Sequence, residues 1–325
     1  MGTKNFLERA FDGQNQWWKY LVVFMVALFA AQFIAAIPLV ILILGKIAAN
    51  GGLEENNLES MADIVALGLP KNLVFGLAML GPLATLIFTV ILVKALHGRT
   101  FAAMVNGTKS VRWNRAFFAF AMWFALMAVY MGMDYFLHPD NYVLQFDPGK
   151  FAVLFLLSVV LIPIQTTSEE LLMRGYLAQG IGAGTRSRWW ALMIPTAIFG
   201  LLHIMNPEVA KFGFLLSMSQ YFFFGFLFGL IAILDDGIEL PMGLHAANNL
   251  FLSLFATHAD STFQTEALFS LKIIDPVQDL ISLVAIGLVA FFILYRKYGW
   301  NIKVMNEKVG TATVDSREIS TVIAG

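Results

Sequence analysis

The sequence predicts an all-α membrane protein, a polytopic bundle of about eight transmembrane helices. Hydrophobic residues make up 58% of the 325 residues and charged residues only 13%, whereas soluble domains carry roughly 25% charged residues. The hydrophobic residues fall in long blocks, several of them close to the roughly 20 residues that a helix needs to cross the hydrocarbon core. The basic residues are concentrated in alternate connecting segments, as expected for a chain that crosses a membrane repeatedly.

The first apolar block, residues 20–44, is about 25 residues long. The apolar region of a cleaved signal peptide has only roughly 7–15 residues, so we interpret this block as a retained helix. Two further blocks follow, at 73–96 and 116–136. The N-terminal part of the chain, 1–150, is therefore predicted to hold three transmembrane spans joined by a basic cytoplasmic loop.

The second half of the chain holds five shorter apolar blocks, several of which contain polar residues. Interrupted or short spans are typical of helices that line a cavity instead of facing lipid. We expect residues 151–256 to form a catalytic core and 257–325 to form the last span and a polar cytoplasmic tail. The five blocks are 151–165 with a continuation, 189–203, 212–234, 241–256 and 280–295.

The positions of the lysines and arginines predict the orientation of the bundle. With a cytoplasmic N-terminus, 16 of the 21 basic residues lie on the inner side and five on the outer side. This bias follows the positive-inside rule and requires an even number of spans. We expect a multi-pass integral protein of a bacterial inner membrane with both termini in the cytoplasm. The outer five are Lys46, Lys71, Lys150, Lys211 and Lys272.

Net charge and cysteine content exclude several functions. The net charge of −1 gives no reason to expect a nucleic-acid partner, and the lipid bilayer is the expected surrounding. The absence of cysteine excludes disulfides, thiolate catalysis and cysteine-ligated metal.

Ionisable side chains within the later apolar blocks call for a functional explanation, because they are costly at membrane depth. Glu170 and Arg174 are four residues apart on a helix, so we expect them to form an ion pair. Glu169 lies about 100° round the helix from Glu170 and can face elsewhere. Two histidines, His203 and His245, also lie within apolar blocks.

Chain geometry predicts that these groups meet. Glu169 and His203 each lie 17 residues from Arg186, so a helical hairpin that turns there places them at equal depth. His245 and Asn249 are four residues apart and point to one side of their helix. A carboxylate, two imidazoles and an amide could then converge in a cavity open to the cytoplasm.

Two chemistries suit this set, and both hydrolyse an amide. Glu169 with a histidine can deprotonate a water, while a histidine and an asparagine donate hydrogen bonds to the oxyanion. Alternatively, Glu169, His203 and His245 could bind a catalytic zinc ion. The sequence H-E-x-x-H is absent, so a metal site would need ligands from three helices. Each group also has a purely structural interpretation, since Glu–Arg pairs lock helices together and a single buried histidine usually serves packing.

Three motifs resemble those of the CPBP intramembrane proteases, also called Abi proteins, which include the type II CAAX prenyl endopeptidases. The family motifs EExxxR, FxxxH and HxxxN match Glu169-Glu170-x-x-x-Arg174, Phe199-x-x-x-His203 and His245-x-x-x-Asn249. All three occur in family order, and the resemblance covers residues 151–255.

The resemblance implies an eight-helix bundle with a conical cavity facing the cytoplasm. It implies Glu169 as the catalytic carboxylate, His203 as its partner in activating water, and His245 with Asn249 as the oxyanion hole. Glu170, Arg174 and Phe199 would support the site. The expected substrate is a peptide or membrane protein, with or without an attached lipid. We favour a metal-free mechanism, because a His–Asn pair is better suited to donate hydrogen bonds than to bind metal, and leave zinc as the alternative cofactor.

Two functions from other classes compete with proteolysis. A non-enzymatic membrane scaffold or bacteriocin-immunity protein could keep the fold without the chemistry, but it would not need both histidines. An ion-coupled transporter could use buried Glu and His as a relay. An inverted repeat would support a transporter, and the sequence shows none.

Overall fold

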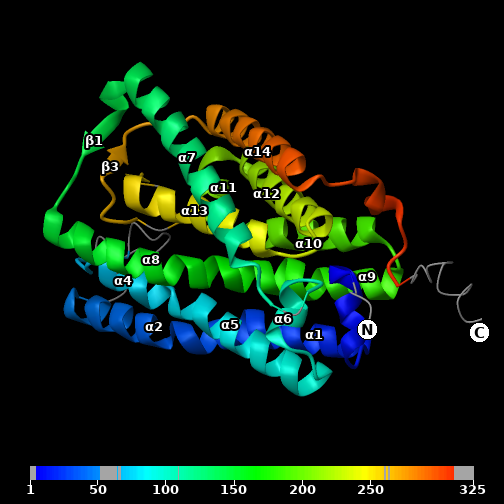
Figure 1. Ribbon diagram of the computed structural model, residues 1–325. Helices are drawn as coiled ribbons and strands as arrows, with labels where there is room; N and C mark the ends of the chain where they lie inside the picture. Colours follow the sequence, from blue (N-terminus) through cyan, green and yellow to red (C-terminus); the bar gives the residue numbers. More distant parts are fainter. Residues whose placement is uncertain are drawn as a thin grey trace, which may run out of the picture.

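The computed structural model describes residues 5–51, 64, 67–108, 110–259, 261–262 and 264–310. It is a bundle of long helices that run back and forth between two ends, at the left and right of the view (Figure 1). One end carries the N-terminus, α6 and α9, and we call it the basic end. The other carries three short strands and the start of α8, and we call it the strand end. The residues 311–325 of the predicted polar tail lie outside the described residues.

The first three spans match the three N-terminal blocks. The chain opens with the short 3-10 helix η1 (Phe6–Asp12). The first span follows as three continuous segments, α1 (Trp17–Met25), the π-helical η2 (Val26–Ala30) and α2 (Ala31–Ala49). The second is α4 (Lys71–Ala78), α5 (Leu80–Leu92) and the π-helical η4 (Val93–His97). Short α6 (Phe101–Val105) connects it to the third, α7 (Trp113–Leu137).

The second half contains a helical hairpin followed by three more helices. The hairpin runs through α8 (Pro148–Glu170), the π-helical η6 (Leu171–Leu177) and α9 (Ala178–Thr185), and returns as α10 (Arg188–Leu202). Arg186 makes the turn in a left-handed conformation, with φ of 58°. The predicted turn is therefore confirmed. The remaining helices are α11 (Pro207–Phe212), α12 (Phe214–Leu234), α13 (Glu239–Phe255), α14 (Pro276–Tyr298) and the 3-10 helix η7 (Ile302–Asn306).

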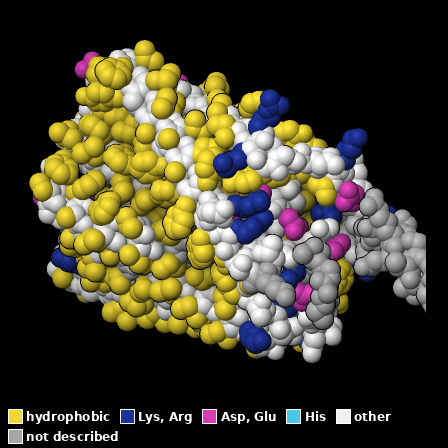
Figure 2. Space-filling model, in the orientation of Figure 1, with side chains coloured by type: hydrophobic (Ala, Val, Ile, Leu, Met, Phe, Trp, Pro, Cys, Tyr) yellow, Lys and Arg dark blue, Asp and Glu magenta, His cyan; other side chains and the backbone are white. Residues whose placement is uncertain are grey.

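Among the described residues, six of these helical stretches are long and apolar enough to cross a membrane, as expected for a multi-pass helical membrane protein. The shorter α10 is also apolar. Figure 2 shows hydrophobic side chains over most of the visible face, with lysines and arginines gathered at the basic end. The six stretches are Trp17–Ala49, Lys71–His97, Trp113–Leu137, Pro148–Thr185, Phe214–Leu234 and Pro276–Tyr298.

A small sheet departs from the all-α prediction. Strand β1 (Tyr142–Leu144) pairs antiparallel with β3 (Phe269–Leu271), which pairs parallel with β2 (Ala256–Thr257). These strands are only two or three residues long, so no alternating pattern of useful length marks them in the sequence. They join the loops after α7, α13 and before α14 at the strand end (Figure 1).

Helix α13 lies at the centre of the second half of the bundle, and nearly all its side chains are buried. Its close contact with α7 depends on Gly243, because a Cβ there would lie 2.1 Å from the carbonyl oxygen of Ala116. Trp123 of α7 donates a hydrogen bond of 3.3 Å to the side chain of Asn248. These contacts fix the helix that carries His245 and Asn249.

Candidate active site

The two adjacent glutamates lie at the end of α8, where the helix changes to the π-helical η6. Single π-helical turns are frequent at functional sites, because they alter which residues share a helix face. The Glu170 side chain is fully buried, whereas 28% of the Glu169 side chain is exposed. The two carboxylates therefore face different surroundings, as the helix geometry predicted.

Glu170 bonds both Arg174, in its own helical stretch, and His245, on α13. Its Oε1 accepts a hydrogen bond of 2.9 Å from Arg174 Nη1 and another of 2.8 Å from His245 Nδ1. The predicted Glu170–Arg174 ion pair is thus present. The Arg174 guanidinium also lies 4.5 Å from the centre of the Phe199 ring, in a cation–π contact. A charged group buried in this way is stable only when its partners stay in place.

The position of Glu170 orients the His245 ring. A carboxylate only accepts hydrogen bonds, so Nδ1 of His245 carries the proton in this pair. Its Nε2 then faces Glu169, at 3.9 Å from Oε2. Phe199 and Phe228 lie beside the ring, with centroid distances of 6.3 and 5.6 Å. The result is an imidazole held between two carboxylates against apolar walls.

Gln165 is a site residue that the sequence analysis missed. Its Nε2 donates to Glu169 Oε1, and its Oε1 accepts a hydrogen bond of 3.1 Å from Asn249 Nδ2. The side-chain amide therefore joins the predicted carboxylate to the predicted oxyanion donor. Its spacing of four residues before Glu169 was the available signal, because side chains at that spacing share a helix face.

His203 lies just after the end of α10, beside the same aromatic residues. Its Nδ1 lies 2.7 Å from the carbonyl oxygen of Phe199, so Nδ1 carries a proton and Nε2 keeps a lone pair. The ring stacks on Tyr221 at 4.3 Å between centroids, and the Tyr221 hydroxyl accepts a hydrogen bond from Asn206. Tyr221 is a second neighbour of the site that the motifs did not indicate.

Glu169 lies near the end of α8 and His203 directly after α10, on the two arms of the hairpin. Among the residues that the structure describes, however, no hydrogen bond or ion pair joins them. The imidazole in contact with Glu169 is that of His245. The site thus brings together Glu169, Glu170, Arg174, His245 and Asn249 directly, and His203 through the ring of Phe199.

The proposed zinc ligands fit a metal only in part. Both histidines have Nδ1 bonded and Nε2 directed elsewhere, a pattern that metal-binding histidines share. Yet no group of three or more His, Asp or Glu side chains in the described part of the chain is arranged to hold a metal ion. Glu169, His203 and His245 therefore do not form a three-ligand set in this arrangement.

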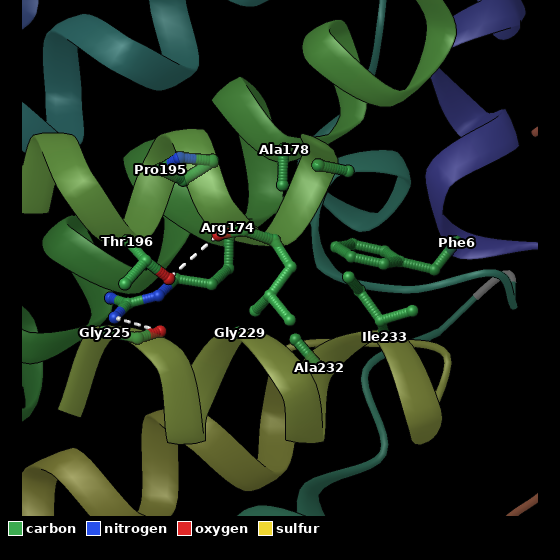
Figure 3. Close-up of a pocket in the computed structure, with 11 residues that line it drawn as sticks. Phe6, Arg174, Ala178, Pro195, Thr196, Gly225, Gly229, Ala232 and Ile233 are labelled. Carbon is green, nitrogen blue, oxygen red and sulfur yellow. Dashed lines mark hydrogen bonds between the residues drawn. The ribbon is translucent and has the colours of Figure 1, made fainter. Parts of the chain in front are cut away.

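The space beside Arg174 on the side of the basic end is closed. A narrow gap between η6, α10 and α12 is lined by Arg174, Thr196, Gly225 and Gly229 among others, and it has essentially no room for a water molecule (Figure 3). Arg174 reaches across it to the carbonyl of Gly225, at 3.4 Å. The expected conical cavity is not seen at this place.

Comparison with known proteins supports the three motifs. Residues 148–251 match the family model described as Type II CAAX prenyl endopeptidase Rce1-like, and so form a domain of that family. The chain is also 29% identical over 289 residues to the uncharacterized protein YyaK of Bacillus subtilis (strain 168), covering 88% of this chain and 93% of the relative. No solved structure matches.

Proposed function

We propose that this chain, which carries a Rce1-like type II CAAX prenyl endopeptidase domain at residues 148–251, is an intramembrane endopeptidase. The observation that carries the proposal is the His245 imidazole, held at Nδ1 by the buried Glu170 and facing the partly exposed Glu169. An imidazole whose ring is fixed by one carboxylate beside a second, partly exposed carboxylate is a pre-positioned polar group next to a possible general base, an arrangement suited to hydrolysis.

The proposed enzyme has eight spans, the six long stretches together with α10 and α13. These two helices have 15 and 17 residues, or roughly 22 and 26 Å at 1.5 Å per residue. Both are shorter than a hydrocarbon core of about 30 Å. Most of α13 is buried in the bundle, whereas α10 buries one face and exposes Trp189, Trp190 and Met193 on the other. Eight spans place both termini on the cytoplasmic side, as the loop charges predict.

Glu169 and His203 are the proposed water-activating pair. Glu169 is the exposed carboxylate of the site, and His203 offers an Nε2 lone pair that no hydrogen bond from the described residues occupies. A water held between them gives a proton to this pair as its oxygen attacks the carbonyl carbon of the peptide. The pair then passes the proton to the amide nitrogen as the C–N bond breaks and the amine departs, which completes the hydrolysis.

His245 and Asn249 are the proposed oxyanion donors. One N–H of the Asn249 amide is used by Gln165, and the other remains for the substrate. The His245 Nε2, which faces Glu169, is the proposed second donor when it carries a proton. Glu170 and Arg174 support this arrangement, and no step requires a metal ion.

The proposed substrate is a peptide or membrane protein, with or without an attached lipid. Activity can be tested with purified full-length protein in proteoliposomes and a quenched fluorescent peptide library. Glu169→Gln, His203→Ala and His245→Ala should each abolish cleavage while the protein remains folded. Glu307→Gln and His138→Ala are matched controls at exposed positions outside the site. Full activity in Glu169→Gln would refute the mechanism, and a wild-type protein without cleavage of any peptide would favour a scaffold.

A further inference from the structure

Along the helices that carry the site, the residues on the side of the basic end are buried, and partly exposed residues occur toward the strand end. Every residue from Glu170 to Gln179, toward the basic end, is buried, and so is every residue of α13 from Glu239 to Asn248. Glu169 and Asn249 are the first residues of each helix that are not buried on the way to the strand end, and Gln165 is also partly exposed. The partly exposed side chains of the site therefore lie on the side that faces away from the basic end.

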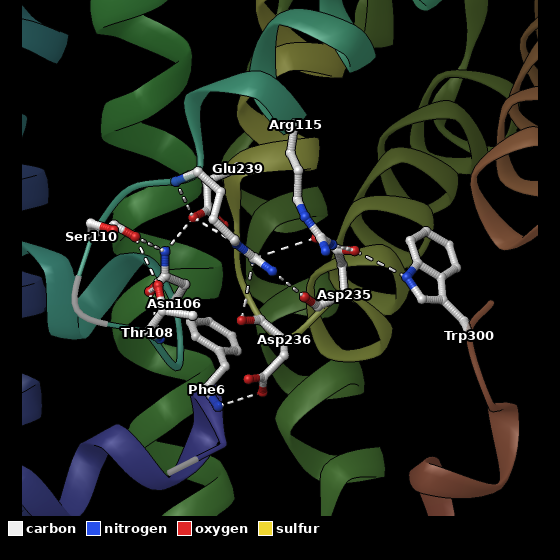
Figure 4. A network of polar contacts seen from close by, with 10 residues as sticks. Phe6, Asn106, Thr108, Ser110, Arg115, Asp235, Asp236, Glu239 and Trp300 are labelled. Carbon is white, nitrogen blue, oxygen red and sulfur yellow. Dashed lines mark hydrogen bonds and ion pairs between the residues drawn. The ribbon is translucent and has the colours of Figure 1, made fainter. Parts of the chain in front are cut away.

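A polar network closes the basic end of the bundle (Figure 4). Arg112 bonds the Glu239 carboxylate through Nε and Nη2, at 3.0 and 2.6 Å, and lies 3.4 Å from Asp235. Trp300 also donates to Asp235, at 3.0 Å. These contacts tie the start of α13 and the α12–α13 turn to the loop before α7 and to the segment after α14.

The N-terminal helix η1 adds a second layer to this end. Gln179 of α9 donates hydrogen bonds of 2.9 Å to the carbonyl oxygens of Phe6 and Ala103. Phe6 and Leu7 are both buried. The gap beside Arg174, which has essentially no room for a water molecule, lies between this layer and the glutamates, so the described residues are closely packed there.

Exposure of Glu169 is informative because the residue is ionisable. The Glu169 side chain is 28% exposed. Contact between a carboxylate and hydrocarbon is costly, so we take this exposed surface to face water or substrate. Because the basic end is the cytoplasmic end by the positive-inside rule, the exposed edge of the site faces the opposite side.

We infer that the site receives its substrate from the non-cytoplasmic side of the membrane, so that the bond it cuts lies in polypeptide exposed on that side. This inference rests on the proposed function and orientation, and it replaces the cytoplasmic opening expected from the sequence. The substrates are then exported segments or the outward parts of membrane proteins, and the products are released outside the cytoplasm.

The absence of cysteine makes the inference testable without a substrate. Single cysteines at Glu169→Cys or Gln165→Cys report access to the site. Ser110→Cys marks the basic end, and Lys150→Cys marks the strand end; both residues are exposed. A membrane-impermeant maleimide is applied to right-side-out and inside-out vesicles that contain the full-length protein, and detergent-solubilised protein gives the total reactive thiol.

We expect Glu169→Cys to react in right-side-out vesicles together with Lys150→Cys, and Ser110→Cys to react only in inside-out vesicles. Reaction of Glu169→Cys from the Ser110 side alone would overturn the inference, as would reaction from neither side. Labelling of Ser110→Cys in right-side-out vesicles would also overturn the inference, because it would show that the basic end is not cytoplasmic. Gln165→Cys repeats the measurement if Glu169→Cys does not accumulate.

Failure of this inference can be distinguished from failure of the proposed function. Labelling measures access to the site and needs no activity, whereas the proteolysis test with Glu169→Gln measures chemistry in either orientation. A cytoplasm-facing enzyme would fail only the first test, and an outward-facing scaffold only the second.

Discussion

Glu170 and His245 are joined by a hydrogen bond of 2.8 Å between Oε1 and Nδ1, although they lie 75 residues apart in the sequence. The same oxygen also accepts from Arg174. One carboxylate thus holds both an ion pair within its helix and the imidazole of another helix. The stability of the fold and the proposed catalysis therefore both depend on Glu170, and substitutions of the residues around it should affect the two to different extents.

Replacing Arg174 should strongly destabilise the protein. Arg174→Met leaves the Glu170 carboxylate buried without its cation, and removal of one partner of a buried pair costs about 3–5 kcal/mol. Thermal unfolding in detergent should show a clear drop in Tm, with partial recovery in Arg174→Met/Glu170→Gln. Arg296→Met, at an exposed position, is the control. An unchanged Tm in Arg174→Met would show that the pair contributes little to the fold.

Gln165 should affect turnover more than stability. Gln165→Leu removes the amide that holds Glu169 and Asn249, and small misplacements of catalytic groups cost up to about 100-fold in rate. We expect kcat to fall by roughly 10- to 100-fold with little change in KM or Tm. Gln16→Leu, exposed before α1, is the matched control. Equal losses in Gln165→Leu and Gln16→Leu would argue against a positioning role.

Gly243 should be intolerant of any side chain. A Cβ at this position would lie 2.1 Å from the backbone oxygen of Ala116, which cannot move without separating α13 from α7. Overpacking of this kind costs roughly 1–3 kcal/mol, so Gly243→Ala should lower Tm and, by shifting His245, also activity. Gly132→Ala, where a Cβ meets nothing within 4 Å, should have neither effect. Normal stability in Gly243→Ala would mean that the two helices are farther apart.

Asp236 should make stability depend on pH. Burial raises the pKa of Asp236 above its ordinary value, although the Phe6 N–H bond and Arg112 oppose this. An acid whose pKa is raised by folding stabilises the folded state below its ordinary value of 3.8, and that stabilisation is lost as the pH rises through the raised value. Tm measured from pH 4 to 8 should therefore fall less in Asp236→Asn than in the wild type. Asp140→Asn, at an exposed position, should follow the wild type, and identical curves for all three proteins would contradict the prediction.

Metal analysis decides between the two chemistries that the sequence allowed. Glu169, His203 and His245 do not form a three-ligand set, so purified protein should hold clearly less than one zinc per chain and should stay active after chelation. Elemental analysis of the wild type beside Glu169→Gln and His203→Ala measures this. Near-stoichiometric zinc that disappears together with activity in both variants would establish a metalloprotease instead.

The helices could be predicted because apolar block length and loop charge are properties of local sequence. The turn at Arg186 and the Glu170–Arg174 pair were predictable for the same reason, since both depend on spacing within one hairpin. The contact of His245 with Glu170 was not, because it depends on how far α13 is shifted along α8. Sequence analysis therefore paired His245 with Asn249, assigned His203 to Glu169, and did not predict the bond from His245 to Glu170. The short strands had no periodic signal, and Gln165 was overlooked because its amide is uncharged.

The closed basic end also has a consequence for how the protein is made. Phe6 bonds to Asp236, and Glu8 accepts a hydrogen bond from the backbone of Gly310, 302 residues later. At about 5–20 residues per second, the ribosome needs roughly 15 to 60 s to supply that last partner. The N-terminal helix therefore cannot complete its contacts until the segment after the final helix has been made. Truncation of the chain shortly after Tyr298 should make that first segment more accessible to added protease.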